Sequence, residues 1–277
     1  MSGRIDLHIH TSYSDGLSSP EKVLEIVRKK RLVAFAICDH DNVEGYFAAK
    51  RLLVENDPEL IPGVELSAGK DNDDIHILGL FFDPGASILN GALKECRERR
   101  NLRAEKMLAK LKELGIAISF EMVQEIAGNS AIGRPHIADA LLKVGAVSSY
   151  EAAFGKFIGN KCRAYVPKKN ITPGEAIELI HKAGGLAFLA HPGIGNAASY
   201  LDEFIKLGID GIETYHPNHI GRQKAKFSAL AEEKKILATG GSDYHGREGR
   251  FGAIGSQSVP DDLLLAMKEK IKSKHRG

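Results

Sequence analysis

The stretch DLHIHTSYSDG, residues 6–16, combines two histidines and two acids with the pattern of a buried β-strand. His8 and His10 are two residues apart on that strand, so their side chains point to the same face. Gly16 allows the backbone after the strand to fold Asp15 back toward the two histidines. Imidazoles and carboxylates together suit zinc, manganese or iron, so this stretch predicts a metal site.

Similar residues follow other expected strands. Two further groups are CDHD, residues 38–41, and SDYHG, residues 242–246. Because α/β barrels have their active sites at the carboxyl ends of the strands, we expect these side chains to meet at one mouth. Taken singly, each has an ordinary explanation, such as a core position for His76 or a helix N-cap for Asp41. The further candidate ligands are His40, Glu65, His76, His191, Asp243 and His245.

Short apolar runs alternate with helical patterns over much of the chain, which predicts βα units and a parallel sheet. Residues 18–21 and 172–175 have the cap residues and early proline of helix starts, and Pro260 is expected to open the last helix. A helix is also expected at residues 44–54. The expected strands are residues 5–10, 33–37, 60–66, 74–82, 186–191, 211–215 and 236–243.

The alternation stops at about residue 86 and resumes after about residue 165. We therefore expect a helical insertion, residues 86–165, in a barrel formed by residues 1–85 and 166–277. One helical stripe in the insertion carries apolar residues, but Arg100 and Arg103 fall close to it where apolar side chains are expected. A helix surface is the simpler explanation for the two arginines, and a position facing the site is the alternative.

Charge is unevenly spread along the chain. Residues 90–170 contain 15 basic and 8 acidic residues, a surplus of 7, although the whole chain has a net charge of only +2. A solvated basic helix and a basic flap over an anionic ligand both explain the surplus. The low net charge argues against a general nucleic-acid binder.

Size and composition fit a soluble α/β protein of 277 residues with one large barrel or two medium domains. No apolar run approaches the ~18 residues of a membrane span, and no secretion signal is evident. Three isolated cysteines, Cys38, Cys96 and Cys162, argue against a disulfide framework and predict a cytoplasmic location. No membrane association and no obligate protein partner are inferred.

Taken together, the blocks HxH (8–10), DHD (39–41), His191 and DxH (243–245) resemble the four motifs of the polymerase and histidinol phosphatase (PHP) family of metal-dependent phosphoesterases. The segments GVE (63–65), GRPH (133–136) and YHPNH (215–219) resemble its stand-alone members. Those members include nucleoside 3′,5′-bisphosphate phosphatases and 5′-to-3′ exoribonucleases. The resemblance implies an α/β fold, a distorted (β/α)7 barrel of the PHP type with an inserted helical subdomain.

The resemblance also implies a trinuclear centre of divalent metal ions, with manganese the first choice and iron or zinc as alternatives. The usual threonine before the Asp-His pair is Cys38 here, and we expect its side chain to pack in the interior. The implied ligands are His8, His10, Glu65 and Asp243 for one ion, Glu65, His76 and His191 for a second, and Asp15, His40 and His245 for the third.

Such a centre would trap a phosphate and activate a bridging hydroxide to attack phosphorus, with Glu65 and Asp243 at the catalytic centre. Arg134, His136 and His219 are the expected substrate-binding residues, and His219 is also a candidate proton donor, favoured over His216. An arginine suits a second phosphate because its guanidinium binds phosphate bidentately. A surface arginine at a helix start is the simpler alternative for Arg134.

The expected activity is therefore hydrolysis of a phosphate monoester of a nucleotide, the 3′-phosphate of a nucleoside 3′,5′-bisphosphate first among them. Exonuclease action on short RNA oligonucleotides, from the 5′ end, is the main alternative. A small-molecule phosphatase of the histidinol-phosphate type is another, although a monophosphate needs no second clamp. A non-catalytic module, as attached to some polymerases, is disfavoured because a scaffold needs no full ligand set.

Overall fold

Eight strands form one sheet in this computed structural model, which describes residues 3–71, 73–128, 130–167, 171–247 and 252–274. Their order across the sheet is β7-β6-β5-β4-β3-β2-β1-β8. The bounds are β1 Arg4–Ile9, β2 Ala34–Ile37, β3 Glu59–Lys70, β4 Asp73–Leu80, β5 Leu186–Leu189, β6 Gly211–Tyr215, β7 Leu237–Gly240 and β8 Val259–Pro260.

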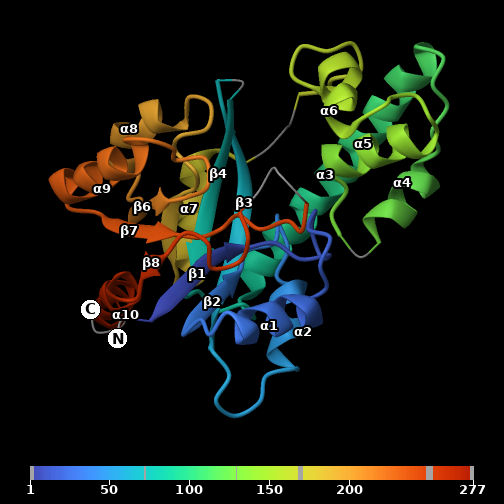
Figure 1. The fold of residues 1–277 in the computed structure, drawn as a ribbon. Coiled ribbons are helices and arrows are strands. Elements are labelled where there is room, and N and C mark those ends of the chain that lie inside the picture. Colours follow the sequence, from blue (N-terminus) through green and yellow to red (C-terminus); the bar gives the residue numbers. More distant parts are fainter. Residues whose placement is uncertain (1–2, 72, 129, 168–170, 248–251, 275–277) are drawn as a thin grey trace.

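The sheet curls until β7 comes close to β1, which makes a nearly closed barrel (Figure 1). The chain just past β7 joins β1 through a parallel bridge between Ile9 and Tyr244, and the N–H of His10 donates to the Tyr244 carbonyl at 2.9 Å. Gly241 permits this approach, because a Cβ there would lie 2.4 Å from the backbone nitrogen of His8. The predicted α/β barrel is thus confirmed.

The expectation of a parallel sheet is wrong for β4, which runs antiparallel to both β3 and β5. Only two residues separate Lys70 from Asp73, too few for the crossover that a parallel pair needs. The two strands therefore form a hairpin, paired from Gly63 opposite Leu80 to Lys70 opposite Asp73. Because β4 is reversed, its beginning lies at the mouth where the other strands end.

The helices of the barrel are α1 Pro20–Lys29, α2 Glu44–Lys50, α7 Pro173–Lys182, α8 Leu201–Lys206, α9 Gln223–Lys234 and α10 Asp262–Lys274, with the short 3-10 turn η2 Ala197–Tyr200. The predicted starts of α1 and α7 are confirmed, since Ser19 caps the first and Thr172 forms a capping box with Glu175 in the second. The last helix begins two residues later than predicted, because Pro260 pairs with Arg4 in β8.

Side chains alternate between two cores along the strands. In β5, Ala187 and Leu189 pack in the cluster that includes Ile177 and Ile180 of α7. The neighbouring residues of the strand, Leu186 and Phe188, join a different cluster with β1, β2 and β4. The sheet is therefore buried on both faces, as its near-continuous apolar strands require.

The chain between β4 and α7 forms the helices α3 Ser87–Glu113, α4 Phe120–Ala127, α5 Arg134–Lys143 and α6 Tyr150–Ala153, with the π-helix η1 Phe154–Ile158. Figure 1 shows α4, α5 and α6 gathered to one side of the barrel, with α3 leading to them. At 27 residues α3 is about 40 Å long. It packs Leu89 and Leu93 in a barrel core and Met107 and Leu111 in the core of the insertion.

Within the described ranges, no helix combines the length and the apolar character that crossing a bilayer would require.

Candidate metal centre

The barrel mouth gathers all nine side chains that the sequence analysis proposed as metal ligands. They come from β1 and the loop after it, from the loop after β2, from within β3 and β4, and from the loops after β5 and β7. None of the nine is exposed. These residues are His8, His10, Asp15, His40, Glu65, His76, His191, Asp243 and His245.

The ligand atoms of His8, His10 and Asp243 all lie within 4.8 Å of one another, and Glu65 approaches the same two histidines. The Nε2 atoms of His8 and His10 lie 3.1 Å apart. Glu65 Oε2 and Asp243 Oδ1 each lie 3.5 Å from His8 Nε2 and 3.3 Å from His10 Nε2. Ligands about 2.0–2.1 Å from a tetrahedral ion are about 3.3 Å apart, so the spacing of each carboxylate from the two histidines fits a shared ion.

Glu65 connects this group to a second one. Its Oε1 lies 3.0 Å from His76 Nδ1 and 2.9 Å from His191 Nε2. Its other oxygen faces the first group and also lies 3.1 Å from His40 Nδ1. One carboxylate thus presents a separate oxygen to each group, which is the arrangement of a bridging ligand.

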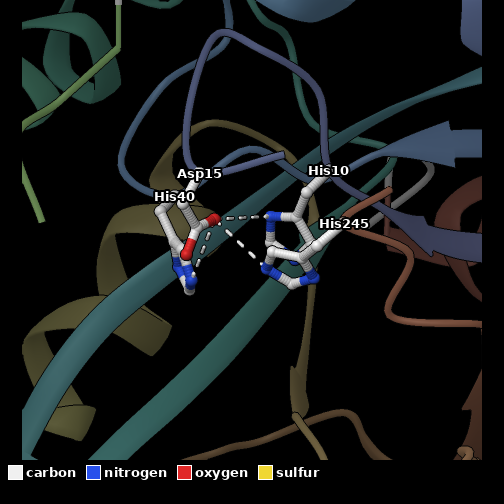
Figure 2. A group of neighbouring side chains, drawn as sticks. All are labelled: His10, Asp15, His40 and His245. Atoms are coloured by element: carbon white, nitrogen blue, oxygen red, sulfur yellow. Dashed lines mark ion pairs between the residues drawn. The ribbon is translucent and has the colours of Figure 1, made fainter. Parts of the chain in front are cut away.

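A third group surrounds Asp15. Figure 2 shows its carboxylate facing the rings of His10, His40 and His245. Asp15 Oδ1 lies 3.1 Å from His245 Nε2 and 3.9 Å from both His40 Nε2 and His10 Nδ1. Among the described residues, Asp15 Oδ1 and His40 Nδ1 are buried without a hydrogen bond. Buried polar atoms in this state call for a further partner, and a cation suits them.

The electric field at these groups favours positive charge. Burial raises the pKa of the Glu65 and Asp243 carboxyls, but the histidines around them bring each well below its usual range. Burial lowers the pKa of His10, yet Asp243 and Glu65 raise it to about 10 overall. Burial dominates for His40, whose pKa falls to about 3, so its ring is neutral and able to bind a metal. The field that favours a proton on His10 favours a divalent cation in the same place.

Glu213 holds two of the candidate ligands and was missed by the sequence analysis. It is fully buried in β6, and its Oε1 lies 3.0 Å from His8 Nδ1 while its Oε2 accepts a hydrogen bond from the N–H of His191 at 2.7 Å. A carboxylate on Nδ1 leaves Nε2 of the same ring free for a metal. The available signal was a lone acid inside the apolar run GIETY, residues 211–215.

The other acids of the DHD block shape the loops around the site. Asp39 accepts hydrogen bonds from the backbone and hydroxyl of Thr11 and from the hydroxyl of Ser14. Asp41 accepts from the N–H of Ser67 and from Arg100. The predicted N-cap role of Asp41 is therefore wrong, because its carboxylate is held by β3 and α3 rather than by the start of α2.

Cys38 packs in the interior as expected. It is fully buried, and its thiol donates to the carbonyl of Leu7 at 3.3 Å. Burial raises the pKa of this thiol, which disfavours the thiolate that would compete for a metal.

A cavity of about 300 Å³ lies over the candidate ligands, between the barrel mouth and the insertion. Its lining includes Arg100 and Arg103, so the explanation of these residues as plain helix surface is wrong. The two arginines interrupt the apolar stripe at the point where α3 passes over the site between its two cores. The insertion side of the lining also includes Arg134, Tyr150 and Phe154, and the loop after β7 adds Arg247.

Arg134 faces this cavity, but its guanidinium already donates hydrogen bonds to other side chains. Its Nη2 donates to Asp74 at 3.1 Å, and its Nη1 donates to the side chain of Asn160 at 2.9 Å. The guanidinium also lies 5.7 Å from the ring centre of Phe154.

The two other expected substrate-binding residues bond to backbone groups. His136 Nδ1 accepts from the N–H of Gly133 at the start of α5. His219 Nδ1 donates to the carbonyl of Thr214, and its Nε2 accepts from the N–H of Gly193. Neither histidine lies in the cavity lining, so their contact with substrate stays a prediction.

His216, which the sequence analysis ranked below His219, lies closer to the candidate ligands. Its Nε2 is 3.3 Å from Asp243 Oδ2, and its side chain is buried. The ring also lies 5.5 Å from that of His191. This geometry favours His216 over His219 for an influence on the candidate metal groups.

Comparison with known proteins agrees with this arrangement. Residues 6–212 match the PHP domain family, and the chain belongs to that family. The "5'-3' exoribonuclease Rnm" of Escherichia coli is 34% identical over 87% of this chain and 84% of its own length. The 3',5'-nucleoside bisphosphate phosphatase of Chromobacterium violaceum is 33% identical over 87% of each chain.

A third relative acts on a different phosphate ester. The phosphoribosyl 1,2-cyclic phosphate 1,2-diphosphodiesterase of Eggerthella lenta is 30% identical over 90% of this chain and 97% of its own length. A crystal structure from Bifidobacterium adolescentis, described as that of a metal-dependent phosphoesterase, is 29% identical and covers 95% of this chain and 94% of its own, with a TM-score of 0.85. The present protein is accordingly a metal-dependent phosphoesterase, a hydrolase of phosphoric ester bonds.

Proposed function

We propose that the protein removes the 3′-phosphate from nucleoside 3′,5′-bisphosphates. The observation that carries the proposal is one cavity with candidate metal ligands on its barrel side and arginines on its insertion side. A phosphate ester bound to the ligand side leaves the arginine side for a second anionic group. The Chromobacterium violaceum relative, with 33% identity, acts on a substrate of this kind.

The proposed cofactors are three divalent ions, with manganese first and iron or zinc as alternatives. His8, His10, Glu65 and Asp243 would hold one ion, Glu65, His76 and His191 a second, and Asp15, His40 and His245 the third. Bound divalent ions supply Lewis-acid charge and lower the pKa of water, which is the chemistry that phosphate-ester hydrolysis needs.

The chain's own residues would prepare the site in three ways. Glu65 and Asp243 bring negative charge to the centre of the mouth, and their loss would remove the field that favours cations. Glu213 holds the His8 ring so that Nε2 faces the site. We propose that a histidine at the mouth protonates the leaving 3′-oxygen. The sequence predicts His219 for this role, and His216 lies nearer to the candidate metal ligands.

The insertion, residues 86–165, would act as a cap on the barrel of residues 1–85 and 166–277. Three ion pairs join the two parts across the cavity, and a half-open cavity of about 300 Å³ suits a mononucleotide or the end of a short oligonucleotide better than a duplex. Arg134 would contact the substrate from the cap, and His136 would support the start of α5 beneath it. A cytoplasmic location agrees with this nucleotide chemistry.

Exonuclease action on short RNA, from the 5′ end, is the second candidate. The Escherichia coli relative, at 34% identity, carries that activity. Tyr150 and Phe154, with ring centres 5.1 Å apart in the cavity lining, offer surfaces on which a base could stack. A histidinol-phosphate type of substrate fits less well, because a monophosphate has no second anionic group for the arginine side of the cavity.

The test is phosphate release from a set of esters with manganese present. The set contains adenosine 3′,5′-bisphosphate, AMP, a 5′-phosphorylated oligoribonucleotide and a ribosyl 1,2-cyclic phosphate. We expect the bisphosphate to have the highest kcat/KM, with AMP and phosphate as products. Faster cleavage of the oligonucleotide would select the exonuclease, and faster opening of the cyclic ester would contradict both candidates.

A further inference from the structure

Four arginines of the described residues line the cavity, and three of them face a carboxylate partner. In each of these pairs one residue comes from the insertion and the other from the barrel. Each carboxylate offsets the positive charge of its arginine and leaves less of it for a ligand. The pairs are Arg100–Asp41 at 2.6 Å, Arg134–Asp74 at 3.1 Å and Arg247–Asp139 at 2.8 Å.

Arg103 is different from the other three. Its Nε donates to the carbonyl of Val166 at 2.8 Å, and its guanidinium lies 5.7 Å from the ring centre of Tyr165. No carboxylate of the described residues lies within ion-pair distance of it. Burial, with a smaller effect of Arg134, lowers the pKa of Arg103 to about 10, so the group remains charged at neutral pH.

One nitrogen of Arg103 also lacks a hydrogen-bond partner in the described part of the chain. Its Nη2 is shielded from solvent and makes no hydrogen bond. A charged guanidinium with an unmade hydrogen bond is costly to bury, and an anion bound beside it in the cavity would offset its charge. Arg103 is also one helical turn from Arg100, which places both over the site on the same face of α3.

We propose that Arg103 binds the phosphate that is not hydrolysed and so determines the preference for bisphosphates. This inference rests on the proposed function, because it assigns the second phosphate of the same substrate. Arg134 is the weaker contact, since Asp74 already accepts a hydrogen bond from it. The 5′-phosphate gains a planar, permanently charged donor at Arg103 without displacing any carboxylate.

The experiment compares adenosine 3′,5′-bisphosphate with adenosine 3′-monophosphate in the wild type and in Arg103→Gln. We expect the substitution to raise KM for the bisphosphate by roughly ten- to a hundredfold, because a hydrogen bond to a charged group is lost. The KM for the monophosphate should stay within about twofold, since that substrate has no second phosphate. Arg103→Lys should recover part of the lost affinity, because lysine retains the positive charge but lacks the paired N–H donors of a guanidinium.

Lys110→Gln is the matched control. Lys110 lies two turns further along α3 and donates to the carbonyl of Tyr165, next to the one that Arg103 contacts, but it is outside the cavity lining. Its substitution should leave both KM values unchanged. Equal changes of the two KM values in Arg103→Gln, or no change in either, would overturn the assignment.

A binding measurement separates the inference from the proposed function. Calorimetry on the metal-loaded protein with AMP, which keeps the 5′-phosphate and lacks the 3′-phosphate, measures binding at the proposed anion site without turnover. If the wild type releases no phosphate from either 3′-phosphorylated nucleotide, the proposed function fails. Weaker binding by Arg103→Gln would then still support the anion site, and unchanged binding would overturn it.

Discussion

The barrel mouth and the insertion form opposite sides of one cavity, and they differ in how completely their charges are balanced. At the mouth, carboxylates and histidines from most of the strands lie about one metal-ligand spacing apart, and Glu65 alone faces five histidines at 2.9–3.5 Å. Of the arginines in the cavity lining, Arg100 and Arg134 of the insertion and Arg247 of the barrel have carboxylate partners, and Arg103 has none among the described residues. The charges at the mouth therefore suit cations, and the arginines across the cavity suit an anion.

This difference separates the residues that would carry out the reaction from those that would select the substrate. The ligand groups belong to the barrel, whereas most of the groups that would distinguish one phosphate ester from another belong to the insertion. Relatives with 30–34% identity act on RNA, on a nucleoside bisphosphate and on a cyclic phosphate, which fits one reaction chemistry combined with different selecting surfaces.

The largest effect is expected from a substitution at the barrel mouth. Glu65→Gln keeps the size of the side chain but removes the charge that faces two ligand groups. We expect kcat/KM to fall by about three orders of magnitude or more, because transition-state charge stabilisation is lost. Initial rates on the best ester measure the effect. A rate within tenfold of the wild type would show that Glu65 does not join the two groups.

A change in the core of the insertion tests whether the two sides are independent. Leu111 is fully buried among the insertion helices. Leu111→Ala should lower the free energy of unfolding by about 2–5 kcal/mol, as cavity-forming core substitutions do. Urea denaturation followed by circular dichroism gives this value.

The metal content of the same variant is its control. Since every candidate ligand belongs to the barrel, Leu111→Ala should bind as much metal as the wild type while folded. Loss of metal below the unfolding transition would mean that the insertion supports the mouth directly.

The smallest effect is expected from a substitution beside Arg134, on the insertion side of the cavity. Asp74→Asn removes the negative charge that accepts a hydrogen bond from Arg134. We expect KM for the bisphosphate to fall about two- to fivefold, since a partly exposed ion pair of this kind is weak. Steady-state kinetics with the monophosphate as the control substrate measures the change. A rise in KM would instead indicate that Asp74 holds Arg134 in its binding position.

Much of the mouth could be predicted from the sequence because its residue types are rare in strands. Histidines and acids at strand ends have few roles, so His8, His191 and Asp243 were recognisable without structure. His76 was found for a partly wrong reason, since it lies near the beginning of the antiparallel strand β4. The short connection between β3 and β4 indicates that β4 is antiparallel, but the apolar pattern of a strand does not indicate its direction.

The insertion side was harder to predict, and the reason lies in α3. A helix that passes between two cores has no single apolar face, so its periodicity did not decide whether Arg100 and Arg103 face solvent or the site. Glu213 was missed because one acid in an apolar strand has many explanations. Only the fold places it beside His8.

The measurement that tests the central claim most directly is the number of metal ions bound per chain in protein purified after metal-replete expression. Elemental analysis of the purified protein provides this number. The ligand geometry predicts two to three transition-metal ions per chain. A chain that folds as described and binds none would contradict the account.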